Sequence, residues 1–347
     1  MSFPLSQLRT WFLEERRDLP WRESPTPYQV WISETMLQQT RVAVVLRYYD
    51  LWMKQFPDVQ SLAEAPIEKV IKTWEGLGYY SRARNLHETA KKILIFYGGE
   101  LPEDEKELEK LKGFGPYTVG ALRSFAFHKK AAAVDGNVYR VLTRYFLIEE
   151  EITKKSTQQT IKGLVEGLLP DFEPWVIMEA LIELGAKVCT KKPRCHLCPL
   201  KKNCLSLLHD KAEELPKKNA KQETIILFRQ VAVIKWKNEV LIAKESFGKV
   251  MADLYYFPYF ERENQDYSPK DLVEDIFQNF SLKVRLQKRL DKVTHGFTKY
   301  SAHLFPSLLE AEEKLPIPGF EWVEWEKAKE LPFSAGYRKI IINFQQV

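Results

Sequence analysis

The residues with the clearest chemical capacity are four cysteines that fall within sixteen positions of one another. Cys189, Cys195, Cys198 and Cys204 follow the pattern C-x5-C-x2-C-x5-C, and no other cysteine occurs in the 347 residues. Four thiolates so close in sequence can surround one centre, and thiolate-only ligation suits Zn²⁺ or an iron–sulfur cluster. Because there is only one C-x2-C pair and the outer gaps are short, the spacing favours a cubane cluster. Zinc remains the second interpretation.

Basic side chains surround these cysteines. No acidic residue occurs from 187 to 202, and the six basic residues there are Lys187, Lys191, Lys192, Arg194, Lys201 and Lys202. Such a run is often only a solvated surface. Around a metal-bound loop it could instead contact a phosphate backbone, whose charge supplies most non-specific affinity for DNA. His196 is expected beside the metal site or in solvent rather than as a ligand.

A glycine-rich turn lies in LKGFGPYTVGAL, at 111–122. Gly113 and Gly115 permit a tight turn between two helices, and the second helix would expose backbone N–H groups at its start. Such a hairpin can hold a DNA phosphate without reading bases. Ordinary helix corners also contain glycine, so the pattern alone predicts only the turn.

Two carboxylates stand out by their surroundings in the sequence. Asp135 follows the apolar run AAAV and precedes Gly136, which is typical of a helix N-cap, where Asp accepts N–H bonds in any protein. Glu34 lies between the apolar residues Ile32 and Met36, which predicts a buried rather than an exposed glutamate. Taken alone, the structural N-cap role is favoured for Asp135.

A helical domain is expected to position these residues. From about Leu5 to Leu208, amphipathic segments alternate with Gly- and Pro-containing breaks. The segment EELPKKNAKQE, at 213–223, is polar and Lys-rich, so we predict a linker. Beyond it, residues 224–347 predict a smaller α+β domain. The expected strands are 224–236, 239–243, 299–305 and 320–325, and the expected helices are 269–280 and 334–344.

The composition sets mild limits on function. The formal net charge of +5 permits a polyanionic partner without establishing one. The first twenty residues lack the uninterrupted apolar run of a signal peptide or membrane span. We therefore expect a cytoplasmic protein of bacterial type, associated with the nucleoid and without a membrane partner. In a reducing cytoplasm, clustered cysteines are typically metal ligands rather than disulfides.

Five segments together resemble a known family. WISETMLQQTRV, GLGYYSRARNL, LKGFGPYTVGAL, AVDGNVYRVLTR and the cysteine segment have the order and spacing of the MutY adenine DNA glycosylases. These enzymes belong to the helix–hairpin–helix superfamily, which includes endonuclease III. The resemblance is dense over residues 1–208 and continues more faintly to the C-terminus. It implies a mainly α fold: a two-lobed helical core at 1–212 with a [4Fe–4S] loop at 189–204, followed by a MutT-like (Nudix-like) α+β domain at 224–347.

The resemblance also implies roles for the two carboxylates. Glu34 would be the general acid that protonates a flipped adenine, and Asp135 would stabilise the oxocarbenium-like sugar. The chemistry parallels glycoside hydrolysis, in which one carboxyl stays protonated while another stays charged. Burial would raise the pKa of Glu34, whereas N–H donors would keep Asp135 ionised. The positions that would support this centre are Tyr117, Asn137 and Glu179.

Further positions match the family's contacts with DNA. A flipped base leaves a gap in the stack, which a side chain has to fill. By resemblance, Gln38, Gln39 and Tyr79 would act as wedges at the opposite base. The positions that match the adenine pocket are Trp21, Arg22, Leu37 and Val42. Thr298, in HGFTK, lies where the family reads 8-oxoguanine.

The sequence departs from the family pattern in four places. The first cysteine gap has five residues where the family has six, and Lys112 replaces a proline of the hairpin. Lys299 replaces the last histidine of the motif that reads 8-oxoguanine. The segment before Phe257 and Pro258 lacks the glycine and tryptophan residues that are usual there in the family. The second domain also shows no Glu-rich Nudix box, so we predict recognition of the lesion there, without nucleotide hydrolysis.

One residue separates two subclasses. Endonuclease III-type lyases carry a hairpin lysine that forms a Schiff base with the sugar, whereas Tyr117 occupies that position here. We therefore expect a monomeric, monofunctional glycosylase acting on duplex DNA with adenine opposite 8-oxoguanine, and also opposite guanine. The alternatives are an endonuclease III-like glycosylase/lyase for oxidised pyrimidines and a non-catalytic DNA-binding protein that contains a metal.

Overall fold

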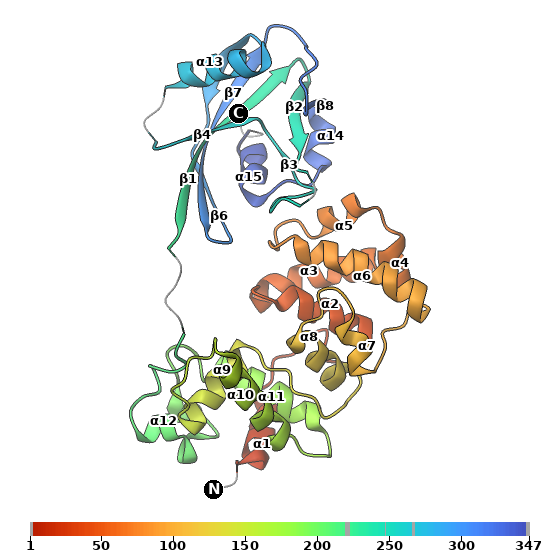
Figure 1. Cartoon of the computed structure of the whole chain (residues 1–347), viewed down its shortest axis with the longest axis vertical. Coiled ribbons are helices and arrows are strands. Elements are labelled where there is room, and N and C mark those ends of the chain that lie inside the picture. The colour runs from red at the N-terminus through yellow and green to blue at the C-terminus, as the bar shows by residue number, and fades with distance from the viewer. Residues whose placement is uncertain (1–2, 219–222, 247, 266–267, 345–347) are drawn as a thin grey trace. The chain divides into compact units, whose positions relative to one another are not determined.

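The chain forms two units in a computed structural model that describes residues 3–218, 223–246, 248–265 and 268–344 (Figure 1). Its contacts group Met1–Ala63 with Glu88–Lys221, and Glu64–His87 with Gln222–Val347. The predicted linker, 213–223, includes residues 219–222, which lie outside the described residues. None of the described helices combines the length and apolar character needed to cross a lipid bilayer.

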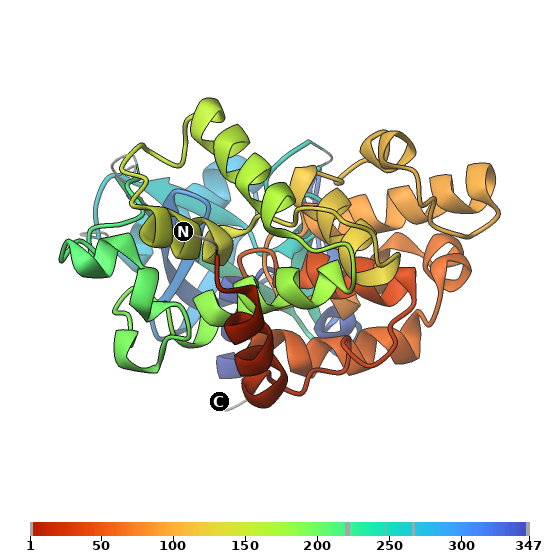
Figure 2. The same cartoon turned by 90° about the horizontal axis from the view of Figure 1, so that it is seen from below.

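The N-terminal part of the chain is helical, as the sequence predicts. Its elements are α1 (Leu5–Glu15), α2 (Pro27–Leu37), α3 (Val42–Gln55), α4 (Val59–Glu64), α5 (Ile67–Thr73), α6 (Ser81–Tyr97), α7 (Glu105–Glu109), α8 (Pro116–Ala121), the π-helix η1 (Leu122–Ala126), α9 (Gly136–Phe146), α10 (Lys155–Leu168), α11 (Pro174–Lys187), the 3₁₀ turns η2 (Cys195–Leu197) and η3 (Lys201–Asn203), and α12 (Leu205–Leu208). α1, at the start of this part of the chain, packs against α11, which lies near its end (Figures 1 and 2).

Helix α2 is enclosed by other elements on nearly all sides. Its start is fixed by a capping box in which Thr26 accepts from the backbone of Gln29 and Gln29 accepts from the backbone of Thr26, with Pro27 at the first position. Eight of the nine positions from Tyr28 to Met36 are buried, all except Gln29. A helix that is apolar all round belongs in a core. Any ionisable residue on it is therefore removed from water.

Helices α9 and α11 approach each other closely at a glycine. A Cβ on Gly185 of α11 would lie 2.5 Å from Cβ and 2.9 Å from Cα of Asn137 on α9. No side chain fits in that space, so glycine is required for this approach. The packing fixes the first turn of α9, which begins beside Asp135.

The second unit contains a mixed sheet. Its strands are β1 (Ile225–Trp236), β2 (Glu239–Lys244), β3 (Tyr255–Tyr256), β4 (Tyr259–Arg262), β5 (Val284–Arg289), β6 (Val293–Phe297), β7 (Tyr300–Ala311) and β8 (Glu321–Glu324), and its later helices are α13 (Pro269–Phe280), α14 (Trp325–Glu330) and α15 (Ala335–Phe344). The order is β3-β2-β1-β7-β5, and β4, β6 and β8 pair with β1, β7 and β2, respectively. The central strands β1 and β7 run parallel, and their register pairs Ile225 with Tyr300.

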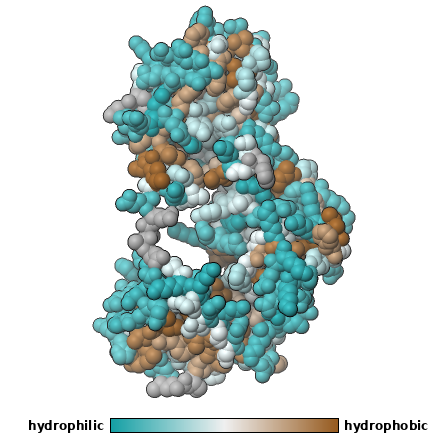
Figure 3. All heavy atoms as spheres, in the orientation of Figure 1, coloured by the Kyte–Doolittle hydropathy of each residue, from teal (hydrophilic) through white to brown (hydrophobic). Residues whose placement is uncertain are grey.

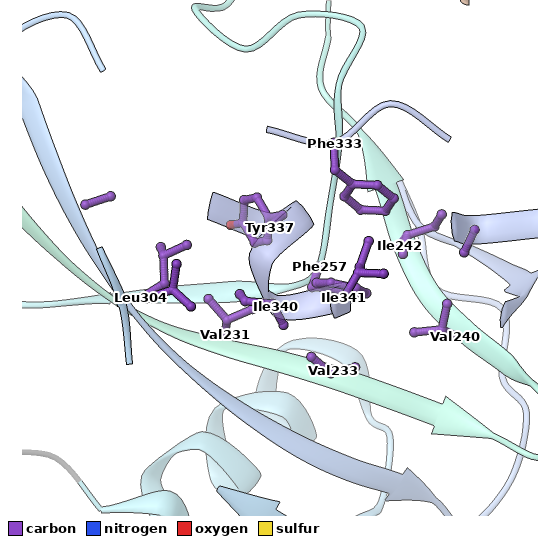
Figure 4. Packing of buried hydrophobic residues seen from close by; sticks show 13 residues of the cluster. Val231, Val233, Val240, Ile242, Phe257, Leu304, Phe333, Tyr337, Ile340 and Ile341 are labelled. Atoms are coloured by element: carbon purple, nitrogen blue, oxygen red, sulfur yellow. The ribbon is translucent and has the colours of Figure 1, made fainter. Parts of the chain in front are cut away.

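Alternate residues of β1 divide the core of this unit in two. Val231 and Val233 face α15, where they pack with Phe257 and Ile340 (Figure 4). Ala232 and Ile234 point the other way and pack beneath α13. Helices thus cover both faces of the sheet (Figure 1). In the view of Figure 3, hydrophilic residues cover most of the outer face of each unit.

Candidate active site

A cleft in the first unit brings together most of the residues that the sequence singled out. It has a volume of about 660 Å³ and is bordered by α2, the turn before α3, the 113–117 hairpin, the start of α9, and α11. The predicted residues that line it are Trp21, Arg22, Glu34, Leu37, Gln38, Gln39, Val42, Gly113, Gly115, Tyr117, Asp135, Asn137 and Glu179. Residues separated by up to 158 positions in the chain therefore line the same cleft.

Two predicted residues lie in the second unit. Tyr79 is in the loop between α5 and α6, is about half exposed, and has a left-handed backbone with φ of 49°. Thr298 is exposed at the tip of the β6–β7 hairpin, where φ is 47°. Both side chains are available at the surface of that unit.

Glu34 is a buried carboxyl on α2. Its side chain points into the cleft but the residue is only 7% exposed. The Tyr117 hydroxyl donates a 2.5 Å hydrogen bond to Glu34 Oε2. The pKa of Glu34 is raised to about 7, mainly by burial; the nearby Asp135 and Glu179 carboxyls also raise it, while the Tyr117 hydrogen bond and Arg22 lower it. Near neutral pH, Glu34 thus holds a proton that an ordinary glutamate has lost.

Asp135 caps α9, as its sequence context predicts. Oδ1 accepts hydrogen bonds from the backbone N–H groups of Asn137 (2.9 Å) and Val138 (2.8 Å), and Oδ2 accepts one from Asn137 Nδ2 (2.7 Å). Burial raises the pKa of Asp135 above its ordinary value, while the three donors and Arg140 pull it down. The net direction of the pKa shift is upward, although the donors that the sequence predicts favour the charged form. The donors limit the rise, and they fix the carboxylate plane.

A chain of hydrogen bonds connects Asp135 to the cysteine loop. Asn137 Oδ1 accepts from Arg140 Nη2 at 2.7 Å, while its Nδ2 donates to Asp135. Arg140 Nε donates to the carbonyl of Cys189 at 2.6 Å, and Nη2 also donates to the carbonyl of Gly185 at 2.7 Å. One guanidinium therefore ties the first turn of α9 to the end of α11 and to the first cysteine. Because the Arg side chain is planar and has five donors, it can hold three acceptors at once.

A second ionic group joins α11 to Arg17 and Arg22, which line the cleft. Glu183 on α11 is completely buried and accepts from Arg17 Nε at 2.7 Å and from Arg22 Nη2 at 2.8 Å. Burial alone would raise the pKa of Glu183, but the two guanidinium groups outweigh it and hold the pKa below its ordinary value. Arg22 also pairs with Glu179, 3.4 Å away. Arg22 is thereby oriented within the cleft between two carboxylates.

The two turns at the cleft have different backbones. Gln39 lies in the left-handed region, with φ of 57°, and the preceding Gln38 donates to the Thr118 hydroxyl at 3.3 Å. Gly113 has φ of 87°, which requires glycine, whereas Gly115 is extended and a Cβ there would meet nothing within 4 Å. Of the two hairpin glycines, Gly113 has a backbone conformation that favours glycine, and Gly115 does not.

The four cysteines line one small cavity. Arg144, which is 2% exposed, reaches the same cavity and holds the surrounding loop. It donates to Cys189 Sγ (3.4 Å) and to the carbonyls of Thr190 (2.6 Å) and Leu215 (2.9 Å). The beginning of the predicted linker is thus packed on the first unit through Leu215.

The donor set at this cavity suits a thiolate-bound group. Burial raises the pKa of Cys189 and Cys195, and raises the pKa of Cys198 to about 12. Neutral thiols are poor ligands, and a bound cation would supply the charge that favours the thiolates. Four thiols that line one cavity are a donor set that fits Zn²⁺ or an iron–sulfur cluster.

Family models match both parts of the chain. Residues 32–166 match the model of the HhH-GPD superfamily of base excision DNA repair proteins, and residues 230–343 match that of the NUDIX domain. The first match contains Glu34, Tyr117 and Asp135. The second covers the mixed sheet with α13 and α15.

Relatives of known activity extend the match over most of the chain. An adenine DNA glycosylase of Buchnera aphidicola (subspecies Baizongia pistaciae) is 34% identical over 84% of this chain and 81% of its own length. The chain belongs to the adenine DNA glycosylase family. The rat member of this family is 30% identical over 98% of this chain and 77% of its own length, and the human one is 41% identical over 60% of this chain and 40% of its own.

Solved structures of other DNA glycosylases share the fold of the helical part. A thermostable thymine-DNA glycosylase has a TM-score of 0.54 and 30% identity, covering 59% of this chain and 95% of its own. Endonuclease III trapped on DNA has a TM-score of 0.52 at 24% identity, covering 60% of this chain and 94% of its own, which shows a shared fold. The predicted combination of a helical glycosylase core and a Nudix-like domain is confirmed.

Several residues that shape this family member's site were not predicted. Arg140 stands three positions after Asn137, on the same face of α9, so helical spacing could have indicated the contact. Glu183 stands four positions after Glu179, on the same face of α11, so helical spacing could have indicated that the two lie side by side. For Gly185 and Arg17 the sequence carries no such signal, because their partners are more than forty and more than one hundred and sixty positions away.

The glycine of the α9–α11 contact can be tested by adding one methyl group. Gly185→Ala places Cβ against the backbone of Asn137, so we expect destabilisation of about 1–3 kcal/mol, the usual cost of overpacking a close contact. Urea denaturation measures the change.

Gly163→Ala on α10 is the matched control. A Cβ there meets nothing within 4 Å, and alanine favours the helix by up to about 1 kcal/mol. Equal stability of the two variants would contradict the close contact.

Proposed function

We propose that this protein is a monofunctional adenine DNA glycosylase that acts on duplex DNA in which adenine is opposite 8-oxoguanine or guanine. The single observation that carries the proposal is the buried Glu34 carboxyl, with a pKa near 7, in the same cleft as the hydrogen-bonded Asp135. Hydrolysis of an N-glycosidic bond needs a proton donor for the leaving base and a negative charge beside the sugar. The two carboxyls have environments suited to these two tasks.

Glu34 acts as the general acid. A group with a pKa close to the working pH is both protonated and able to release its proton, which is the condition for efficient transfer. The Tyr117 hydroxyl holds the carboxyl through Oε2 and leaves Oε1 for the base. Protonation makes adenine a better leaving group as its bond to deoxyribose weakens.

Asp135 stabilises the positive charge that develops on the sugar. Its carboxylate is preorganised by two backbone donors and by Asn137, so little reorganisation is needed during the reaction. Asn137 is in turn held by Arg140. A water molecule then completes hydrolysis at the sugar carbon.

The remaining walls of the cleft hold the flipped nucleotide. The adenine pocket consists of Trp21, Arg22, Leu37 and Val42, all of which border the cleft.

Other residues contact the rest of the duplex. Gln38, Gln39 and Tyr79 fill the gap in the base stack, and Thr298 contacts the opposite 8-oxoguanine. Gly113 and Gly115 place the hairpin against a phosphate. Glu179 holds Arg22 in position. The protein works as a monomer, and in a bacterial cell its substrate places it at the nucleoid.

Tyr117 and the lining of the cleft support hydrolysis without lyase chemistry. A Schiff base requires an amine beside the sugar. Among the described residues that line the cleft there is no lysine, and the basic ones are Arg17 and Arg22. The hydroxyl of Tyr117, with a pKa well above its ordinary value because of burial, stays protonated. This favours a glycosylase over an endonuclease III-like lyase for oxidised pyrimidines.

A [4Fe–4S] cluster bound by the four cysteines supplies a structural centre. The cluster would hold the 189–204 loop in place, and five basic residues on the loop, which are exposed, would contact the phosphate backbone. These are Lys191, Lys192, Arg194, Lys201 and Lys202. The catalytic steps use only the protein's own side chains. Zinc is the alternative occupant.

Removal of either carboxyl tests the reaction. In single-turnover assays on a duplex with adenine opposite 8-oxoguanine, we expect Glu34→Gln to slow adenine release about 10²–10⁴-fold, because the acid is lost. Asp135→Asn should slow it about 10²–10³-fold, because the stabilising charge is lost. Glu14→Gln, at an exposed glutamate of α1, is the control and should retain the wild-type rate.

Three outcomes would overturn this proposal. Release of adenine by Glu34→Gln at the rate of wild type would remove Glu34 as the acid. Efficient covalent trapping of wild type on DNA by borohydride would show a Schiff base and favour the lyase. A wild-type protein that binds the duplex without releasing any base would be a non-catalytic DNA-binding protein.

Metal analysis tests the occupant of the cysteine cavity. The purified protein should be brown and contain about four iron atoms and four sulfides per chain. Cys198→Ser should lower both contents, since this thiol is one of four around the cavity. Stoichiometric zinc in a colourless wild-type protein would contradict the cluster.

A further inference from the structure

The loop Glu75–Tyr80 combines an exposed aromatic tip with an unfavourable backbone. Gly76 and Gly78 have φ of 102° and 74°, and Tyr79 between them and α6 has φ of 49°. A left-handed conformation is unfavourable for a non-glycine residue. Support for the loop comes from its own unit, because Glu64–His87, which include α5, the loop and the start of α6, group with the C-terminal domain.

An ion pair holds the start of the loop to the C-terminal domain. Arg338 of α15 donates from Nε to Glu75 Oε1 at 2.7 Å and from Nη2 to Oε2 at 3.0 Å. The side chains are only 19% and 13% exposed, so water screens the pair weakly. Two parallel bonds of this kind also fix direction. The backbone N–H of Phe333 adds a third bond to Glu75 Oε1, at 3.2 Å.

The end of the loop is held by the same residue of the C-terminal domain. The Tyr80 hydroxyl donates to the carbonyl of Phe333 at 3.3 Å and accepts from the backbone of Gly76 at 3.3 Å. The Phe333 side chain is completely buried, stacked on Phe257 in the core beside α15 (Figure 4). The main chain of one core residue thus binds both ends of the loop.

Other contacts bring the helices on each side of the loop to the same surface. Lys72 of α5 donates to the carbonyls of Lys329 (3.2 Å) and Leu331 (3.3 Å). Arg84 of α6 donates to the carbonyl of Ala252 at 2.8 Å. The side chain of Tyr79, which lies within this supported loop, is about half exposed.

We propose that Arg338 and the Phe333 backbone are positioning elements for Tyr79. The C-terminal domain then has a second part in the reaction besides Thr298: it sets the conformation of the loop that presents the wedge. Glu75 is the acceptor through which it does so. The inference rests on the proposed function for the role of Tyr79 at DNA, whereas the support of the loop is a property of the free protein.

Hydrogen exchange on the full-length protein without DNA tests the support. Arg338→Gln should speed exchange of the Gly76–Tyr80 amides about tenfold or more, the effect of losing a charge-assisted hydrogen bond. Tyr80→Phe removes one hydroxyl without changing charge and should give a smaller increase in the same amides. Arg285→Gln is the control, since Arg285 pairs with Glu312 within the C-terminal domain and is largely exposed. Unchanged exchange in both loop variants would overturn the inference.

A double-mutant cycle tests whether the support acts through Tyr79. Single-turnover adenine release and duplex affinity are measured for Tyr79→Ala, Arg338→Gln and the double variant. If Arg338 positions Tyr79, each single variant weakens binding to the duplex and the double variant is no worse than Tyr79→Ala. Fully additive losses would show that Arg338 acts by another route and would overturn the inference.

The two levels of the proposal fail in different ways. If the wild-type protein releases no adenine, the proposed function is wrong, and hydrogen exchange still tests the support of the loop. If the wild-type protein releases adenine but the variants exchange the loop amides at the wild-type rate, only the positioning role is wrong. Thermal unfolding of each variant excludes a collapsed C-terminal domain as the cause.

Discussion

The cleft depends on the close packing of α9 against α11. Gly185 lets the backbones meet at Asn137, and Arg140 then bonds to Asn137, Gly185 and the carbonyl of Cys189. The carboxylate of Asp135 is oriented at one end of this chain, and the cysteine loop begins at the other. Asp135 and the first cysteine are thus connected through the side chains of Asn137 and Arg140.

Burial of α2 gives the site its second property. The capping box at Thr26 starts the helix, and neighbouring elements then enclose nearly its whole surface. Among the described residues, Glu34 accepts one hydrogen bond, from Tyr117, whereas Asp135 accepts three. Both carboxyls are buried, but Asp135 receives more of the donors that favour the charged form. In the proposed function, this difference suits Glu34 to donate a proton and Asp135 to stabilise a positive charge.

Local patterns predicted much of this, and tertiary contacts set the rest. The helix at 269–280 has the predicted bounds, since Ser268 caps it and an amphipathic face follows. The burial of Glu34 and the capping by Asp135 also follow from their neighbours in sequence. Strand β5 was missed because it is polar and nearly all exposed, with no alternation to mark it. The grouping of Glu64–His87 with the C-terminal domain rests on contacts such as Glu75–Arg338, whose members are 263 positions apart.

The central claim is that Glu34 carries a proton near neutral pH because it is buried. Carbon-13 NMR of the protein with labelled glutamate, compared with Glu34→Gln to assign the resonance, measures this directly. The carboxyl resonance of Glu34 should titrate with a pKa of about 7, so that it is protonated below that pH and loses its proton as the pH rises through it. A midpoint near the ordinary value of 4.5 would contradict the account.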